Sequence, residues 1–233
     1  MARIGSDLTP RMIINQWVSF RDEWGILSSI SQFKDLENIP DFRRVKNIPL
    51  LGYVYVDHDA GISLKVEGLY FTPGEQPPDC DTFSRFLRDS VSLKFRYDLI
   101  RMLDLSILEN DERIRLSLPV SPEWIQLYEN PKLNTARDCT AIDHLRAEGF
   151  FDDVYAVIMH SGTSEGHTGT SDTPKPEIVW VRLLEYSKED RQFRGILLNQ
   201  PLHEIGIQKN DIVFLNPVRL EDGLLLVVEN TKR

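Results

Sequence analysis

The chain has 233 residues, of which 41% are hydrophobic and 27% charged, a balance typical of globular proteins. Asp and Glu outnumber Lys and Arg by 36 to 27, and the resulting net charge of −9 argues against non-specific binding to DNA, RNA or an anionic membrane. Two cysteines, Cys80 and Cys139, are too few for a disulfide framework or a Cys-based zinc site. No apolar stretch has the length of a signal peptide core or of a membrane helix, so we expect a cytoplasmic protein with no membrane partner.

The first half of the chain carries helix-like and strand-like patterns in turn. Apolar residues recur at spacings of three and four between residues 10 and 33, which predicts an amphipathic helix. The apolar runs 50–56 and 62–71 flank a turn-forming segment and predict a β-hairpin. A second, short helix is expected over residues 81–89, after two consecutive prolines.

Two alternating segments follow, and a proline-containing segment ends this half. Residues 91–99 alternate between apolar and polar, which predicts a strand, although a helix continuing to Leu108 fits as well. Residues 113–120 alternate in the same way. We therefore expect an N-terminal α+β domain over 1–120, a connector over 121–133 and a C-terminal domain over 134–233.

The C-terminal domain has the clearest pattern, with short apolar runs separated by turn residues. A helix over 134–149, capped by Asn134 or Thr135 and ended by Gly149, is expected to pack on the sheet that these runs form. Asp222-Gly223 is a strong signal for a tight turn between two of the strands. The expected strands are 153–160, 177–186, 192–198, 211–217 and 224–229.

The sequence as a whole predicts the α+β class. A mixed α+β domain would be followed by a small, strongly bent antiparallel β-sheet or partial barrel with one packed helix. The polar segment 161–176, rich in Gly, Ser and Thr, lacks any apolar periodicity and predicts a mobile loop.

Two groups of residues could bind a metal ion. Asp57, His58 and Asp59 offer two carboxylates and an imidazole, but neighbours on a strand point to opposite faces, and a turn at a hairpin tip explains them more simply. His160 and His167 flank the polar segment, but a zinc site needs three or four ligands. There is no nucleophile elbow and no Gly-rich phosphate loop, so the sequence predicts no cofactor and no catalytic residue.

Two aromatic residues of the connector are the first candidates for contact with a partner. Trp124 and Tyr128 lie where burial in a core is less assured, and exposed aromatic side chains are enriched at protein interfaces. The same two rings would equally serve to dock the two domains on each other. The remaining tryptophans, among them Trp180, are expected in the core.

Four segments in the last part of the chain carry a resemblance to a known family. They show the pattern Trp-Val-Arg, then Gly-x-Leu-x-Asn-x-Pro, then Gly-Asp-x-Val, with Asn210 where the pattern has glycine. They resemble an uncharacterised bacterial family of small β-rich, SH3-like domains found in accessory or immunity-type proteins. The resemblance implies an SH3-like fold over about residues 140–229 and no catalytic residues. The segments are 145–154, 177–182, 195–201 and 206–213.

Two functions from different classes follow from these observations. The first is a non-enzymatic protein-binding module, with an immunity or regulatory role, that binds a basic partner, because acidic proteins are steered towards basic ones. The alternative is a metal-assisted hydrolase that uses residues 57–59 or the two histidines. Neither reading fixes the oligomeric state or the identity of the partner.

Overall fold

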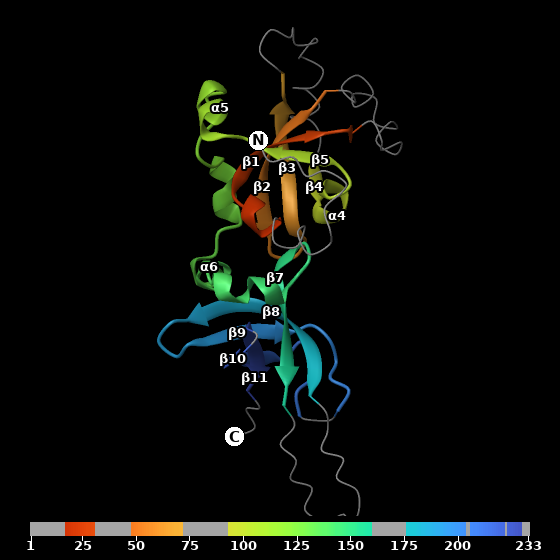
Figure 1. The fold of residues 1–233 in the computed structure, drawn as a ribbon, viewed down its shortest axis with the longest axis vertical. Helices are drawn as coiled ribbons and strands as arrows, with labels where there is room; N and C mark the ends of the chain where they lie inside the picture. The colour runs from red at the N-terminus through yellow and green to blue at the C-terminus, as the bar shows by residue number, and fades with distance from the viewer. Residues whose placement is uncertain are drawn as a thin grey trace, which may run out of the picture. The chain divides into compact units, whose positions relative to one another are not determined.

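The structure is a computed structural model that describes residues 17–30, 48–71, 93–159, 176–203, 206–221 and 223–229. The chain forms two compact units, Met1–Tyr128 and Glu129–Arg233. Both are built on β-sheets (Figure 1), and the longest helix in the described residues has only 7 residues. The protein is therefore mostly β, and the expected α+β class fits it only loosely.

The N-terminal unit contains a five-stranded sheet in which every pair of neighbouring strands is antiparallel. The order across the sheet is β4-β3-β2-β1-β5. The strands are β1 (Glu23–Ser28), β2 (Leu50–Asp57), β3 (Gly61–Leu69), β4 (Lys94–Arg96) and β5 (Asp104–Ile107).

The central hairpin of this sheet, β2 and β3, confirms the hairpin predicted from the two apolar runs. Leu50 and Val54 of β2 are buried on one face, while Tyr53 and Tyr55 are buried on the other. A sheet with both faces buried needs apolar residues at consecutive positions, which is why β2 has little alternation.

The helix predicted over 10–33 is wrong for the part that the structure describes. A short 3-10 helix, η1 (Val18–Phe20), is followed by the strand β1, which pairs with both β2 and β5. Trp24 and Ile26 lie on one face of the sheet and Leu27 on the other. Burial on both faces produced the spacing of three and four that imitates a helix.

Two predicted strands are also corrected. In the described part of this segment, residues 93–99, only β4 is a strand, and a short helix, α4 (Tyr97–Ile100), follows it directly. The segment 113–120 starts in a helix, α5 (Asn110–Arg115), in which Arg113 donates hydrogen bonds to Asn110 Oδ1 and to the Leu118 carbonyl oxygen. The helix predicted over 81–89 lies outside the described residues.

The C-terminal unit is a β-barrel with one additional short strand. Its strands run in the order β11-β10-β9-β8-β7-β6, and β11 also pairs with β7. The strands are β6 (Arg146–Ala147), β7 (Phe150–Ile158), β8 (Glu177–Ser187), β9 (Gln192–Leu197), β10 (Ile212–Leu220) and β11 (Gly223–Val228).

The five predicted strands of this unit are present, but they form a closed barrel and not the expected strongly bent sheet or partial barrel. The pairing of β11 with β7 closes five strands into a barrel, and that one pairing is parallel. An antiparallel meander with an odd number of strands brings its first and last strands into the same direction. Closure also removes the open sheet edges at which other chains could add a strand.

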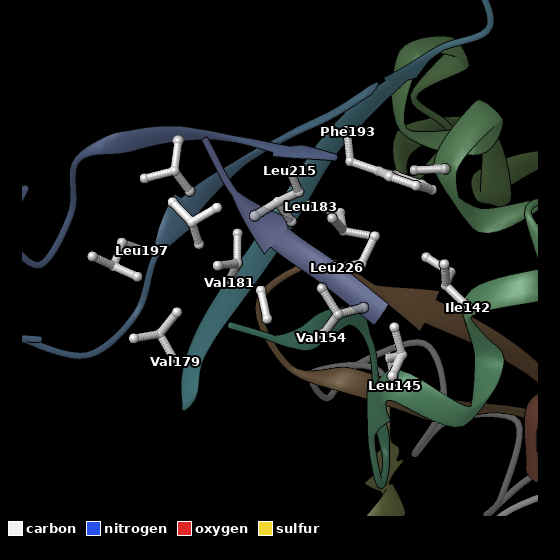
Figure 2. Packing of buried hydrophobic residues seen from close by; sticks show 14 of the residues in the cluster. Ile142, Leu145, Val154, Val179, Val181, Leu183, Phe193, Leu197, Leu215 and Leu226 are labelled. Carbon is white, nitrogen blue, oxygen red and sulfur yellow. The ribbon is translucent and has the colours of Figure 1, made fainter. Parts of the chain in front are cut away.

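A cluster of aliphatic side chains fills the barrel. Figure 2 shows Val181, Leu183 and Leu226 lying together between the strands, where each is 0% exposed. Gly195 of β9 allows this close approach, because a Cβ atom there would lie 2.4 Å from Cγ1 of Val181.

The single helix predicted over 134–149 is wrong, because the structure has two shorter helices there. They are α6 (Pro131–Arg137), capped by the Asn130 side chain, and the 3-10 helix η5 (Thr140–Leu145). Arg146 explains the break, since its Nη2 atom donates to the carbonyl oxygens of Ala136 and Arg137 at 3.0 and 3.2 Å and so satisfies the end of α6. The predicted loop 161–176 lies, apart from Pro176, outside the described residues.

Candidate functional site

The hairpin tip between β2 and β3 holds the first predicted metal-binding group. Asp57 Oδ1 accepts hydrogen bonds from the backbone N–H groups of Asp59 and Ala60, both at 3.1 Å. This is the bonding of an aspartate that stabilises a turn. In the part of the chain that the structure describes, no three His, Cys, Asp or Glu residues are placed to hold a metal ion.

The second predicted metal-binding pair, His160 and His167, lies outside the described residues. The metal-assisted hydrolase therefore gains no support from the geometry that the structure describes.

Trp124 and Tyr128 lie on one face of the N-terminal sheet, in a cluster of aromatic rings. Trp124 belongs to the 3-10 helix η4 (Glu123–Leu127), and Tyr128 follows it directly. The ring of Tyr55 contacts both, with centroid distances of 5.0 Å to Trp124 and 4.6 Å to Tyr128. Both connector residues are half-buried against their own unit.

Two lysines from neighbouring strands lie against these rings. Lys65 of β3 is directly opposite Lys94 of β4 in the register of the sheet. The Lys65 ammonium is 4.1 Å from the ring centre of Trp124 and 3.3 Å from Glu67 Oε1. The Lys94 ammonium donates a hydrogen bond of 2.8 Å to the hydroxyl oxygen of Tyr128. We call Tyr55, Lys65, Lys94, Trp124 and Tyr128 the aromatic–lysine face.

The pKa values of the two phenols of this face are shifted in opposite directions, that of Tyr55 upwards and that of Tyr128 downwards. Burial raises the pKa of Tyr55, and the neighbouring phenol of Tyr128 raises it further. The hydrogen bond from the Lys94 ammonium lowers the pKa of Tyr128, against the opposing effect of partial burial. The Tyr55 hydroxyl is buried and has no hydrogen-bond partner among the described residues.

Sequence reasoning named Asp57 and the two connector aromatics as separate candidates, but the structure relates them. Asp57 and Tyr55 are two residues apart on β2, so their side chains share a face of the sheet, and Tyr55 contacts Trp124 and Tyr128. The lysines were missed. Lys65 lies in a segment that alternates Leu64, Lys65 and Val66, and this pattern marks Lys65 as facing away from the apolar layer.

A second candidate surface lies on the outside of the barrel. Along β8, Val179 and Val181 point into the core, while Ile178 and Trp180 are 64% and 40% exposed. Trp180 is paired with Tyr155 of β7, and their rings meet edge to face at 6.1 Å. We call the outward residues Tyr155, Ile178, Trp180, Ile196 and Ile212 the outer barrel face.

The neighbouring strands and one ion pair continue this surface. Ile196 of β9 is paired with Ile212 of β10, which is 45% exposed. Arg182, the next outward residue of β8, binds Asp153 through two hydrogen bonds of 2.7 and 3.0 Å. The expectation that Trp180 lies in the core is wrong, and the alternation of β8 carried the signal, because Trp180 falls between two inward valines.

None of the helices within the described residues is both long and apolar enough to cross a lipid bilayer. Comparison of the chain with protein families, curated proteins and solved structures finds no match. The resemblance to an SH3-like family therefore stays a prediction.

Proposed function

We propose that the protein is a non-enzymatic protein-binding module that contacts its partner through the outer barrel face. The observation that carries the proposal is the exposure of Trp180, a large aromatic side chain on the outside of a closed barrel whose interior is already filled by other residues.

The surroundings of Trp180 favour binding to another protein. Exposed apolar residues that are neighbours, rather than scattered singly, mark interaction surfaces. Ile178 and Trp180 lie on the same strand, and Tyr155 supports the Trp180 ring from the adjacent strand. Trp and Tyr dominate binding energy at interfaces because they offer a large contact area at a small loss of conformational entropy.

The backbone around Trp180 is fixed before any partner arrives. The Trp180 N–H donates to Asn199 Oδ1 at 2.7 Å, and its carbonyl oxygen accepts from the Leu198 N–H at 2.8 Å. A surface held in its binding conformation loses less entropy on association.

The charge of the chain supports a basic partner. A net charge of −9 attracts a protein of opposite charge over a long range and speeds the encounter between them. An immunity-type or regulatory protein acts in this way when it blocks a basic target. The apolar outer barrel face would supply the contact, and the acidic charge would raise the association rate.

The experiment that tests the proposal compares three forms of the full chain as bait in lysate of the source organism. These are the wild type, Trp180→Ala and Leu220→Ala. Leu220 is a matched control, because it is 53% exposed at the other end of β10 from Ile212. We expect one basic protein to be recovered by the wild type and by Leu220→Ala, and its affinity to fall about tenfold or more in Trp180→Ala.

The association rate of the purified partner with the wild-type protein should also fall as the salt concentration is raised, because salt screens the attraction between opposite charges. A partner that binds Trp180→Ala as tightly as the wild type would show that the outer barrel face is not the contact surface. An association rate that does not respond to salt would remove the argument for a basic partner.

A further inference from the structure

The edge strand β4 of the N-terminal sheet carries two cations for which the described residues supply no counter-ion. Lys94 and Arg96 are two residues apart on this strand, so their side chains lie on the same face of the sheet, and both are exposed. Among the described residues, no carboxylate forms an ion pair with either. Lys65 lies directly opposite Lys94, and two like charges at this position repel each other.

Two phenols lie on the same face and add hydrogen-bond donors. The Tyr128 oxygen already accepts from the Lys94 ammonium, which leaves its O–H free to donate. Tyr55 is in the same row of the sheet as Ser63 and Arg96, two strand spacings or about 10 Å from Arg96. Among the described residues, its buried hydroxyl has no hydrogen-bond partner.

Two carboxylates near these groups, those of Glu67 and Asp57, already accept hydrogen bonds from other donors. Glu67 Oε1 binds both Lys65 and the indole N–H of Trp124. Asp57 accepts the backbone N–H groups of its own turn. Among the described residues at this corner, the three cations Lys65, Lys94 and Arg96 outnumber the two carboxylates, although the protein is acidic as a whole.

We propose that Lys94, Arg96 and Tyr128 form a binding site for a phosphate monoester group. A phosphate dianion has several oxygen acceptors and fits an ammonium, a guanidinium and a phenol O–H at once, through charge-assisted hydrogen bonds. Its negative charge would offset the repulsion between Lys94 and Lys65. The site is in the N-terminal unit and shares no residue with the outer barrel face.

Lysine on an edge strand has an ordinary role in preventing other strands from pairing with that edge. That role explains why each of the two positions, Lys94 and Arg96, carries a charged side chain. It does not account for the Lys94–Tyr128 hydrogen bond or for the buried Tyr55 hydroxyl, and it predicts no saturable binding of an anion.

The test titrates the full chain with inorganic phosphate, and separately with acetate, at constant ionic strength, followed by calorimetry and by the side-chain NMR signals of Tyr128. We expect saturable binding of phosphate but not of acetate. Lys94→Gln and Arg96→Gln should each weaken phosphate binding about tenfold or more, and Tyr128→Phe less, because the phenol contributes one neutral donor. Lys132→Gln, which removes an exposed lysine of α6, is the control and should bind phosphate as the wild type does.

The side chains changed on β4 are exposed, so the variants should fold, and thermal unfolding of each variant checks this. Phosphate binding that does not saturate, or that is equal in Lys94→Gln and the wild type, would overturn the proposal. Equal binding of acetate would overturn the assignment to phosphate.

Discussion

Arg137 and Asp152 form a bidentate ion pair inside the C-terminal unit. Arg137 Nε donates to Asp152 Oδ1 at 2.8 Å, and Nη2 donates to Oδ2 at 2.7 Å. The two side chains are only 9% and 2% exposed. Since Arg137 ends α6 and Asp152 lies on β7, this pair attaches the helix to the barrel.

The buried position of this pair predicts a large loss of stability when one partner is removed. Asp152→Ala should lower the free energy of unfolding by about 3–5 kcal/mol, because the Arg137 charge would stay buried without a counter-ion. Urea unfolding measures the change. Arg194→Ala is the control, since Arg194 and Glu185 form a more exposed pair at 2.8 Å, and its loss should cost at most about 1 kcal/mol. Similar losses of unfolding free energy in Asp152→Ala and Arg194→Ala would show that burial of the ion pair does not decide its contribution to stability.

Two glycines of the central hairpin should respond in opposite ways to the same substitution. In Gly52→Ala, the new Cβ would lie 2.5 Å from Leu64 Cδ2 and 2.7 Å from the Lys65 carbonyl oxygen, so the hairpin must shift, at a cost of about 1–3 kcal/mol. A Cβ at Gly68 meets nothing within 4 Å, and Gly68→Ala should be neutral or stabilising by up to about 1 kcal/mol. Chemical unfolding of the two variants checks both. A destabilisation by Gly68→Ala as large as that by Gly52→Ala would show that space around Cβ does not decide the outcome.

The elements that sequence reasoning placed well are bounded by clear turns, as in the β2–β3 hairpin, and the barrel strands with an exposed outer face also alternate. In β8, the inward residues Val179, Val181 and Leu183 alternate with outward ones, and turn residues bound the strand. Strands buried on both faces lose this alternation. Trp24, Ile26 and Leu27 of β1 are all buried, and nothing local distinguishes their spacing from that of a helix.

The candidate sites depend on pairings that a sequence does not display. Lys65 and Lys94 become neighbours only through the register of β3 with β4, and Tyr55 meets Tyr128 only because η4 lies on that face of the sheet. Closure of the barrel is equally non-local, since it rests on the pairing of Val227 and Val228 with β7. The exposed position of Trp180, by contrast, could have been predicted from alternation alone.

The contact between Lys94 and Tyr128 predicts a change in the ionisation of one phenol. Lys94→Met should raise the pKa of Tyr128 towards its ordinary value, because the ammonium that stabilises the phenolate is gone. Ultraviolet absorbance of tyrosinate during a pH titration, compared with that of Tyr128→Phe, isolates this residue. Lys65→Met is the matched control, because Lys65 lies over the Trp124 ring rather than at the phenol oxygen. An equal rise of the Tyr128 pKa in both variants would point to a general charge effect.

The buried Tyr55 hydroxyl predicts a pH-dependent difference between the wild type and Tyr55→Phe. Burial raises the folded-state pKa of Tyr55 above the value of about 10 in an unfolded chain. Above pH ~10, the unfolded chain therefore releases this proton while the folded chain keeps it. The wild type should lose up to about 1.4 kcal/mol of stability per pH unit from this one group, and Tyr55→Phe should not lose that part.

At neutral pH, the same substitution removes a buried donor that has no partner among the described residues and keeps the ring that packs on Trp124 and Tyr128. Tyr55→Phe should then be as stable as the wild type or more stable. Urea unfolding at several pH values measures both effects, and the difference between the two proteins should be constant below pH ~9 and grow above pH ~10. A loss of more than about 1 kcal/mol at neutral pH would mean that the hydroxyl has a hydrogen-bond partner in solution. In that case the Tyr55 hydroxyl would no longer count as an unsatisfied donor at the proposed phosphate site, and Lys94, Arg96 and Tyr128 would carry the argument alone.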